Sequence, residues 1–265
     1  MSGAASAVRT PDAITRDRVV IAVALAAITL VAWLYLFREA ASMQSMAMEG
    51  RMHEAMGMSD MRAWGAGDWL ALFVMWAAMM IGMMLPSASP VIMLVLGVYR
   101  RRGDRRARLS SLAFVTGYLA VWTMFSVAAA TLQIALHRSA WLTPDMAARS
   151  TIFAGSVLIA AGIYQWLPIK SACLTHCQSS LGFLTQHWRE GVIGGLTLGL
   201  RHGAFCVGCC WALMALLFVV GVMNLVWVAA IATFVLGEKL LARGRDLGRL
   251  GGSLLIVWGL YSLAS

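Results

Sequence analysis

The chain has 265 residues, of which 60% are hydrophobic and only 12% are charged, and its net charge is +9. A soluble domain carries about a quarter charged residues, so this composition excludes an ordinary water-exposed surface and indicates contact with lipid. The basic residues stand in short clusters between apolar runs, which excludes a nucleic-acid-binding face and indicates membrane topology.

An apolar run over residues 19–37 predicts the first membrane helix, because about 20 residues cross a bilayer core of about 30 Å. Residues 1–18 are expected to form a cytoplasmic tail before this anchor. A signal peptide is the competing interpretation, but the length of the run and the interfacial positions of Trp33 and Tyr35 favour a retained helix. Residues 38–67 then form a methionine-rich periplasmic loop.

The rest of the chain, residues 68–265, is expected to be a membrane helical bundle. Its predicted spans cover residues 68–99, 109–136, 148–167, 204–222, 225–240 and 250–264. Pro86 and Pro90 each remove a backbone donor and are expected to kink or break the first of these. Residues 168–203, a cytoplasmic segment with two cysteines, are too polar and Gly-rich for a clean span. Within it, residues 191–203 fit a re-entrant hairpin or an interfacial helix.

The distribution of basic residues sets the predicted orientation. Sixteen of the 21 Lys and Arg residues fall in the tail, between residues 100 and 108, in residues 168–203, or between residues 239 and 249. These segments share one side of the membrane, and the positive-inside rule places that side in the cytoplasm. The predicted fold is therefore an all-α, polytopic transmembrane bundle of about seven spans, with a cytoplasmic N-terminus and a periplasmic C-terminus.

The most unusual segment is MQSMAMEGRMHEAMGMSDM in the first outside loop, with seven methionines and one histidine in nineteen residues. Thioethers are soft ligands that prefer Cu(I), so this density predicts copper binding outside the membrane. The alternative is an amphipathic helix on the membrane surface, with methionine as flexible filler. The candidate ligands are Met43, Met46, Met48, Met52, His53, Met56, Met58 and Met61.

A second group of methionines lies in the span that follows. Met75, Met79 and Met83 are spaced i, i+4 and i+8, which stacks three thioethers on one face of a helix. A stripe of this period is typical of packing, but the methionine-rich loop upstream favours a continuous path of soft ligands. The arrangement is locally similar to that of eukaryotic high-affinity copper transporters.

The five cysteines form two clusters, CLTHC and CVGCC, each with a histidine nearby. Cysteines at i+3 or i+4 share a helix face, so each cluster presents at least two sulfurs together. Two or three thiolates suit Cu(I), and four suit zinc. A buried free cysteine has a packing role as its simplest interpretation, but five in two clusters favour a shared metal or redox function. The candidate ligands are Cys173, His176, Cys177, His202, Cys206, Cys209 and Cys210.

Few other groups in the chain suggest chemistry. Glu238 lies at the end of a predicted span, where snorkelling to the membrane interface explains it, and an ion pair with the adjacent Lys239 is the alternative. No Ser-His-Asp, H-E-x-x-H or paired-carboxylate pattern is visible, so the sequence predicts no catalytic residue and favours a protein that is not an enzyme.

Three long strings carry a family resemblance: MWAAMMIGMMLPSASP, YQWLPIKSACLTHCQSSLGF, and GLRHGAFCVGCCWALMALLFVVGVMNLVW followed by EKL. On these strings the chain, from about Trp69 to its C-terminus, resembles a bacterial family of predicted metal-binding integral membrane proteins, a domain of unknown function. The resemblance implies a multi-pass protein of the bacterial inner membrane. It also implies that all five cysteines, with His176 and His202 alongside, belong to the family's motifs. The methionine-rich loop lies outside the matching part.

The leading hypothesis is a membrane protein that binds a soft metal, Cu(I) above all and zinc as the second candidate, in transport or delivery of the metal. Its expected partners are the lipid bilayer, the metal ion and other membrane subunits, with no nucleic acid. One alternative is a membrane thiol-disulfide oxidoreductase using Cys206 and Cys209. Another is an accessory subunit of a larger membrane complex, stabilised by a structural metal.

Overall fold

The computed structural model describes residues 11–55, 65–143 and 146–264, without the side chains of residues 11–15 and 44–55. The regular elements in this part of the chain are all helices, which confirms the predicted all-α class. In chain order they are α1 (Pro11–Ala55), α2 (Ala66–Arg101), α3 (Ala107–Arg138), α4 (Thr151–Trp166), α5 (Pro168–Gln178), α6 (Ser180–His187), α7 (Gly191–Ala215), α8 (Leu217–Val220), α9 (Leu225–Leu240) and α10 (Gly244–Ala264).

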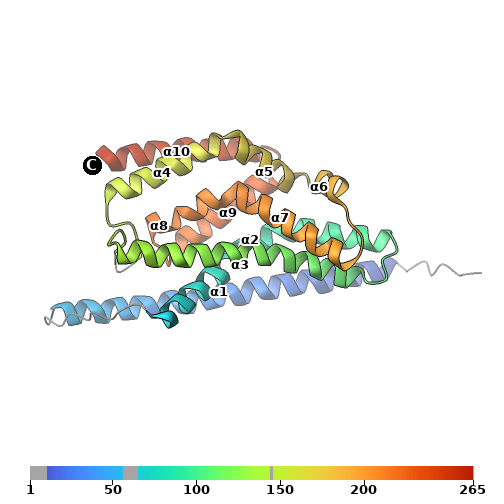
Figure 1. Ribbon diagram of the computed structural model, residues 1–265, viewed down its shortest axis with the longest axis horizontal. Helices are drawn as coiled ribbons and strands as arrows, with labels where there is room; N and C mark the ends of the chain where they lie inside the picture. Colours follow the sequence, from blue (N-terminus) through green and yellow to red (C-terminus); the bar gives the residue numbers. More distant parts are fainter. Residues whose placement is uncertain (1–10, 56–64, 144–145, 265) are drawn as a thin grey trace, which may run out of the picture.

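The helices form an elongated bundle with two outer layers and a central one (Figure 1). The long helix α1 lies along one side and packs on α2, while α4 and α10 pair with each other on the opposite side. Between them, α3 packs on both α2 and α7, and α9 contacts α2. The described end of α1 near the N-terminus and the C-terminal end of α10 lie at opposite ends of the long axis.

Five helices in the described residues are long and apolar enough to cross a membrane, namely most of α1, α2, α3, α7 with α8, and α10. The pair α4 and α5, bent by 64° at their junction, adds a sixth if it is counted as one span. Helix α9 has the bounds predicted for a span, but its 16 residues reach only about 24 Å against a core of about 30 Å. The predicted number of seven and the predicted orientation remain predictions.

Helix α1 is much longer than the anchor expected from the sequence. Its backbone stays helical to Ala55, so the first part of the predicted methionine-rich loop is a continuation of the helix. Met43 is half-buried against the core, whereas the other candidate ligands of this segment lie outside the residues whose side chains are described. The expectation of a loop from residue 38 was therefore wrong as far as Ala55.

Helix α2 continues through both of its prolines, so the break expected there does not occur. Each proline lacks the N–H that would bond to the carbonyl four residues earlier, which frees the carbonyls of Gly82 and Pro86. The Trp33 Nε1–H of α1 donates to the first at 3.3 Å, and the Ser89 hydroxyl donates to the second at 2.8 Å. With both carbonyls satisfied by side chains, the helix tolerates the prolines at low cost.

Helix α7 corrects the expected boundary of the next span. Residues 191–203 are neither a re-entrant hairpin nor a separate interfacial helix, because they form the first half of one continuous helix that carries the CVGCC cluster. Its glycines allow α3 to approach closely: a Cβ at Gly195 or Gly199 would overlap the carbonyl oxygen of Ser110 or Phe114. Small residues at such a seam are typical of helix packing in membranes, and the polar-looking, Gly-rich composition reflects this packing.

Candidate metal centre

The CVGCC cluster lies in the C-terminal half of α7 and is buried. The thiols of Cys206, Cys209 and Cys210 are all at most 1% exposed. Their spacing places them on one face of the helix, as predicted. The Cys209 and Cys210 thiols donate to the Cys206 carbonyl at 3.1 Å and 2.9 Å, which holds both sulfurs close to the helix backbone.

Helix α5 brings the second cluster to the first. The Cys177 sulfur is buried and lies 4.0 Å from the Cys209 sulfur. Cys173, one turn earlier, is half-buried and packs against Gly208 of α7. The Tyr164 hydroxyl donates to the Gly208 carbonyl, which ties α4 to the same turn. Two cysteine clusters separated by about thirty residues thus meet inside the bundle. Helical spacing relates only residues three or four positions apart, so it could not predict this meeting.

A methionine of α2 completes the group of sulfurs. The Met84 Sδ lies 3.9 Å from the Cys210 sulfur. The predicted stripe of Met75, Met79 and Met83 is buried as well, each side chain at most 2% exposed. However, the methionine that reaches a cysteine is Met84, one position beyond the stripe. Adjacent residues point to different sides of a helix, so the stripe lies on a different face of α2 from Met84.

The two histidines predicted as ligands beside the cysteines occupy different surroundings. His202 is 3% exposed and lies among the rings of Phe114, Tyr118 and Phe183, with centroid distances of 5.3–5.8 Å. Its Nδ1 has no hydrogen-bond partner among the described residues. His176 is half-buried and stacks flat on Phe205 at 4.2 Å between centroids. His202 is therefore the better placed of the two to act beside the buried sulfurs.

A lysine that the sequence did not single out touches the sulfur cluster. The Lys239 ammonium, carried by α9, donates to the Cys206 sulfur at 3.0 Å and to the Ser87 hydroxyl at 2.9 Å. The Tyr118 hydroxyl also contacts this sulfur at 3.2 Å and donates to the Met84 carbonyl at 3.1 Å. The Cys206 sulfur thus has two polar side-chain partners, one ammonium and one hydroxyl. A hydrogen bond from a charged donor is stronger than a neutral one.

The ion pair expected between Glu238 and Lys239 does not form. Glu238 instead pairs with Lys170 of α5 at 2.5 Å, and both side chains are at most 3% exposed. The Gln178 amide donates to the Glu238 carbonyl at 2.7 Å. Adjacent residues on a helix point about 100° apart, so neighbours in sequence face different partners.

The sulfur contacts in the described residues come in pairs. No group of three or more His, Cys, Asp or Glu side chains in this part of the chain is arranged to hold a metal ion. Two sulfurs are enough for Cu(I), whereas a zinc site takes four ligands in a tetrahedron. Since two metal–sulfur bonds of about 2.3 Å span at most about 4.6 Å, the 4.0 Å between Cys177 and Cys209 fits a single bridging soft ion.

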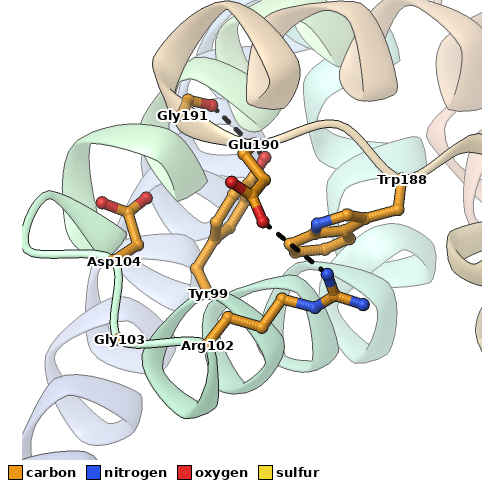
Figure 2. Close-up of a pocket in the computed structure, with 7 residues that line it drawn as sticks. All are labelled: Tyr99, Arg102, Gly103, Asp104, Trp188, Glu190 and Gly191. Atoms are coloured by element: carbon orange, nitrogen blue, oxygen red, sulfur yellow. Dashed lines mark hydrogen bonds and ion pairs between the residues drawn. The ribbon is translucent and has the colours of Figure 1, made fainter.

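A separate pocket opens at one end of the bundle (Figure 2), where the α2–α3 turn meets the start of α7, with a volume of about 480 Å³. The Arg102 guanidinium lies over the Trp188 ring at 4.9 Å and 3.8 Å from a Glu190 oxygen. The pocket is lined by Tyr99, Arg102, Gly103, Asp104, Trp188, Glu190 and Gly191. None of these is a predicted ligand, so the pocket is distinct from the sulfur cluster.

Comparison with known proteins identifies the family. The sequence model of the PpoB2 family, described as a copper chaperone, matches residues 73–262. The chain belongs to the PpoB2 family. A copper-related function, expected from the soft ligands, is thereby confirmed at the level of the family, and so is membership of a metal-related family. No curated protein and no solved structure matches the chain.

The range matched by the PpoB2 family contains all five cysteines, the stripe on α2, Met84 and Lys239, and leaves the methionine-rich end of α1 outside. Met84, Ser87, Tyr118 and Lys239 are the contacts that the sequence analysis missed. Lys239 could have been found, because an ionisable residue within an apolar membrane helix marks a functional site by default. The other three carry no signal in the sequence, since a buried Tyr, Ser or Met is usual in any bundle.

Proposed function

We propose that the chain binds Cu(I) inside the membrane through the sulfurs of α5 and α7 and passes it on to a recipient protein. The observation that carries the proposal is the 4.0 Å separation of the Cys177 and Cys209 sulfurs, contributed by two helices and buried from water. Thiolates and thioethers prefer Cu(I) among biological metals. Cys206, one turn before Cys209, is the next sulfur that an ion held by this pair can contact, and Met84 with Cys210 offers a thioether–thiol pair beside it.

The proposal includes a route for the metal. The methionines between residues 43 and 61 capture Cu(I) on the periplasmic side of the bacterial inner membrane, and Met75, Met79 and Met83 relay it inward along α2. The cysteines then hold the ion in a buried site, where it is protected from water and oxidants. Delivery follows by exchange of sulfur ligands with a recipient, a step that soft ligands make fast because no single bond has to break before the next one forms.

Metal analysis of the purified chain tests this function. The full-length protein, loaded with Cu(I) in detergent under reducing conditions, is expected to retain about one copper per chain. The double variant C177S/C209S is expected to lose this copper, because serine oxygens are hard ligands. The matched control is C173S, which removes the half-buried thiol of the same cluster and leaves the pair intact, so it is expected to keep the metal.

Two other results would favour the alternatives. Zinc in place of copper, lost with the cysteines, indicates a structural site and an accessory-subunit role. Absence of any metal, together with a Cys177–Cys209 crosslink on mild oxidation, indicates thiol–disulfide chemistry. The second candidate is kept because the same two sulfurs need to approach only from 4.0 Å to the about 2.05 Å of a disulfide.

A further inference from the structure

Lys239 places a positive charge inside the sulfur cluster. Its side chain is 7% exposed, and the hydrogen bonds of its ammonium go to neutral or sulfur acceptors, Ser87 and Cys206. The adjacent carboxylate, that of Glu238, is already paired with Lys170. The charge of Lys239 therefore faces the cysteines, and the Glu238 carboxylate does not neutralise it.

The distances fix how strongly this charge acts on a bound metal. Because the Lys239 nitrogen lies 3.0 Å from the Cys206 sulfur and a metal–sulfur bond measures about 2.3 Å, a metal on Cys206 lies within about 5.3 Å of the ammonium. Cys209 and Cys210 lie within electrostatic range of it as well. In a buried site the repulsion between two cations at this distance is weakly screened.

We propose that Lys239 makes the sulfur cluster selective for a monovalent soft cation over divalent cations. The inference rests on the proposed function and specifies its substrate class. The ammonium repels a divalent ion twice as strongly as a monovalent one, while the thiolates alone would favour the divalent ion. The repulsion from Lys239 depends on the charge of the metal and not on the number of thiolates that bind it. Lys239 therefore weakens the binding of a divalent cation more than that of a monovalent one in every case.

The test compares two metals on one protein. Cu(I) affinity is measured by competition with bicinchoninate, and Co(II) serves as the divalent probe through its thiolate-to-cobalt absorption, both on the full chain in detergent. In K239Q the ratio of the Co(II) to the Cu(I) dissociation constant is expected to fall by about tenfold or more. K239R keeps the charge and is expected to keep the wild-type ratio.

A second pair of variants keeps the lysine in place, in case K239Q does not fold. S87D puts a carboxylate beside the ammonium, at the position now held by the Ser87 hydroxyl, and is expected to lower the ratio in the same direction. S87N is the matched neutral control and is expected to behave as wild type. An unchanged or increased ratio in both K239Q and S87D would overturn the inference.

Loss of Cu(I) binding in K239Q, with binding kept in K239R, would also overturn it, because Lys239 would then support binding of the ion and not choose its charge. The proposed function is judged separately, on the wild-type chain. A wild type that retains no Cu(I) contradicts that function, and the inference with it, before any ratio is compared. A wild type that retains Cu(I), with no change of ratio in the variants, contradicts the inference alone.

Discussion

Two lysines are buried where other helices pack on α9. One lies between α5 and α9, the other between α9 and the pair α2 and α7, and they meet different acceptors. Lys170 meets a carboxylate, that of Glu238, at 2.5 Å. Lys239, on the next residue of α9, meets the Cys206 sulfur and the Ser87 hydroxyl. In the first region the charges are neutralised, because Lys170 and Glu238 form an ion pair. In the second region the described partners of the lysine are a hydroxyl and a sulfur, and that sulfur is a candidate metal ligand.

This difference separates a group that holds the bundle together from a group placed for a ligand. Removing one member of a buried ion pair strands the other charge, which is costly. Removing Lys239 leaves a hydroxyl and a cysteine sulfur. A thiol without a neighbouring cation is neutral at pH 7, so both groups tolerate burial far better than a carboxylate does. The two lysines are thus expected to respond differently to the same substitution.

The largest expected effect is in the region of the ion pair. Lys170→Met leaves Glu238 as an unpaired buried carboxylate and is expected to lower the free energy of unfolding by about 3–5 kcal/mol. Denaturant titration in detergent measures it. The double variant K170M/E238L removes both charges and is expected to regain most of the loss. If the double variant were no more stable than K170M, the ion pair would not be the cause of the destabilisation.

The seam between α3 and α7 gives a third case, because at this seam the helix of the sulfur cluster is held by close backbone packing at glycines. Gly199→Ala adds a Cβ that would overlap the Phe114 carbonyl and is expected to cost about 1–3 kcal/mol of unfolding free energy. The control is Gly67→Ala in the first turn of α2, where nothing lies within 4 Å of the added Cβ. Equal stability of the two variants would mean that α3 and α7 do not pack as closely as described.

The smallest effect on stability is expected in the region of Lys239. Lys239→Met is expected to change the unfolding free energy by about 1 kcal/mol or less, because the hydroxyl and the thiol that remain without the cation are neutral groups. The same variant is expected to shift the preference between Cu(I) and Co(II) described above. A loss of stability as large as that of K170M would show instead that Lys239 is required for folding. The two lysines would then not differ in their contribution to stability.

Much of the helical framework could be read from hydropathy alone. Helix α9 has the bounds predicted for it, since an apolar run between two polar turns leaves little choice. The first half of α7 was missed because Arg201, His202 and several glycines lower its mean hydropathy. Those glycines are explained only by the carbonyls of α3, and a window of sequence contains no information about a helix eighty residues away.

The candidate site divides in the same way. Helical spacing is enough to place Cys206, Cys209 and Cys210 on one face, and soft-ligand chemistry is enough to suggest copper. That Cys177 reaches Cys209, and Met84 reaches Cys210, depends on how α2 and α5 pack on α7. The extended helix of residues 38–55 was likewise unexpected, because a dense run of methionine and charged residues is compatible with both a helix and a loop.

The apolar runs and the sulfur side chains identify a helical membrane protein with a set of soft ligands, because hydropathy and the chemistry of sulfur are local properties of the sequence. Which sulfurs meet, and that a lysine lies against one of them, is visible in the folded chain alone. Those contacts join residues up to 152 positions apart, and their geometry follows from the close packing of whole helices, which no local pattern encodes.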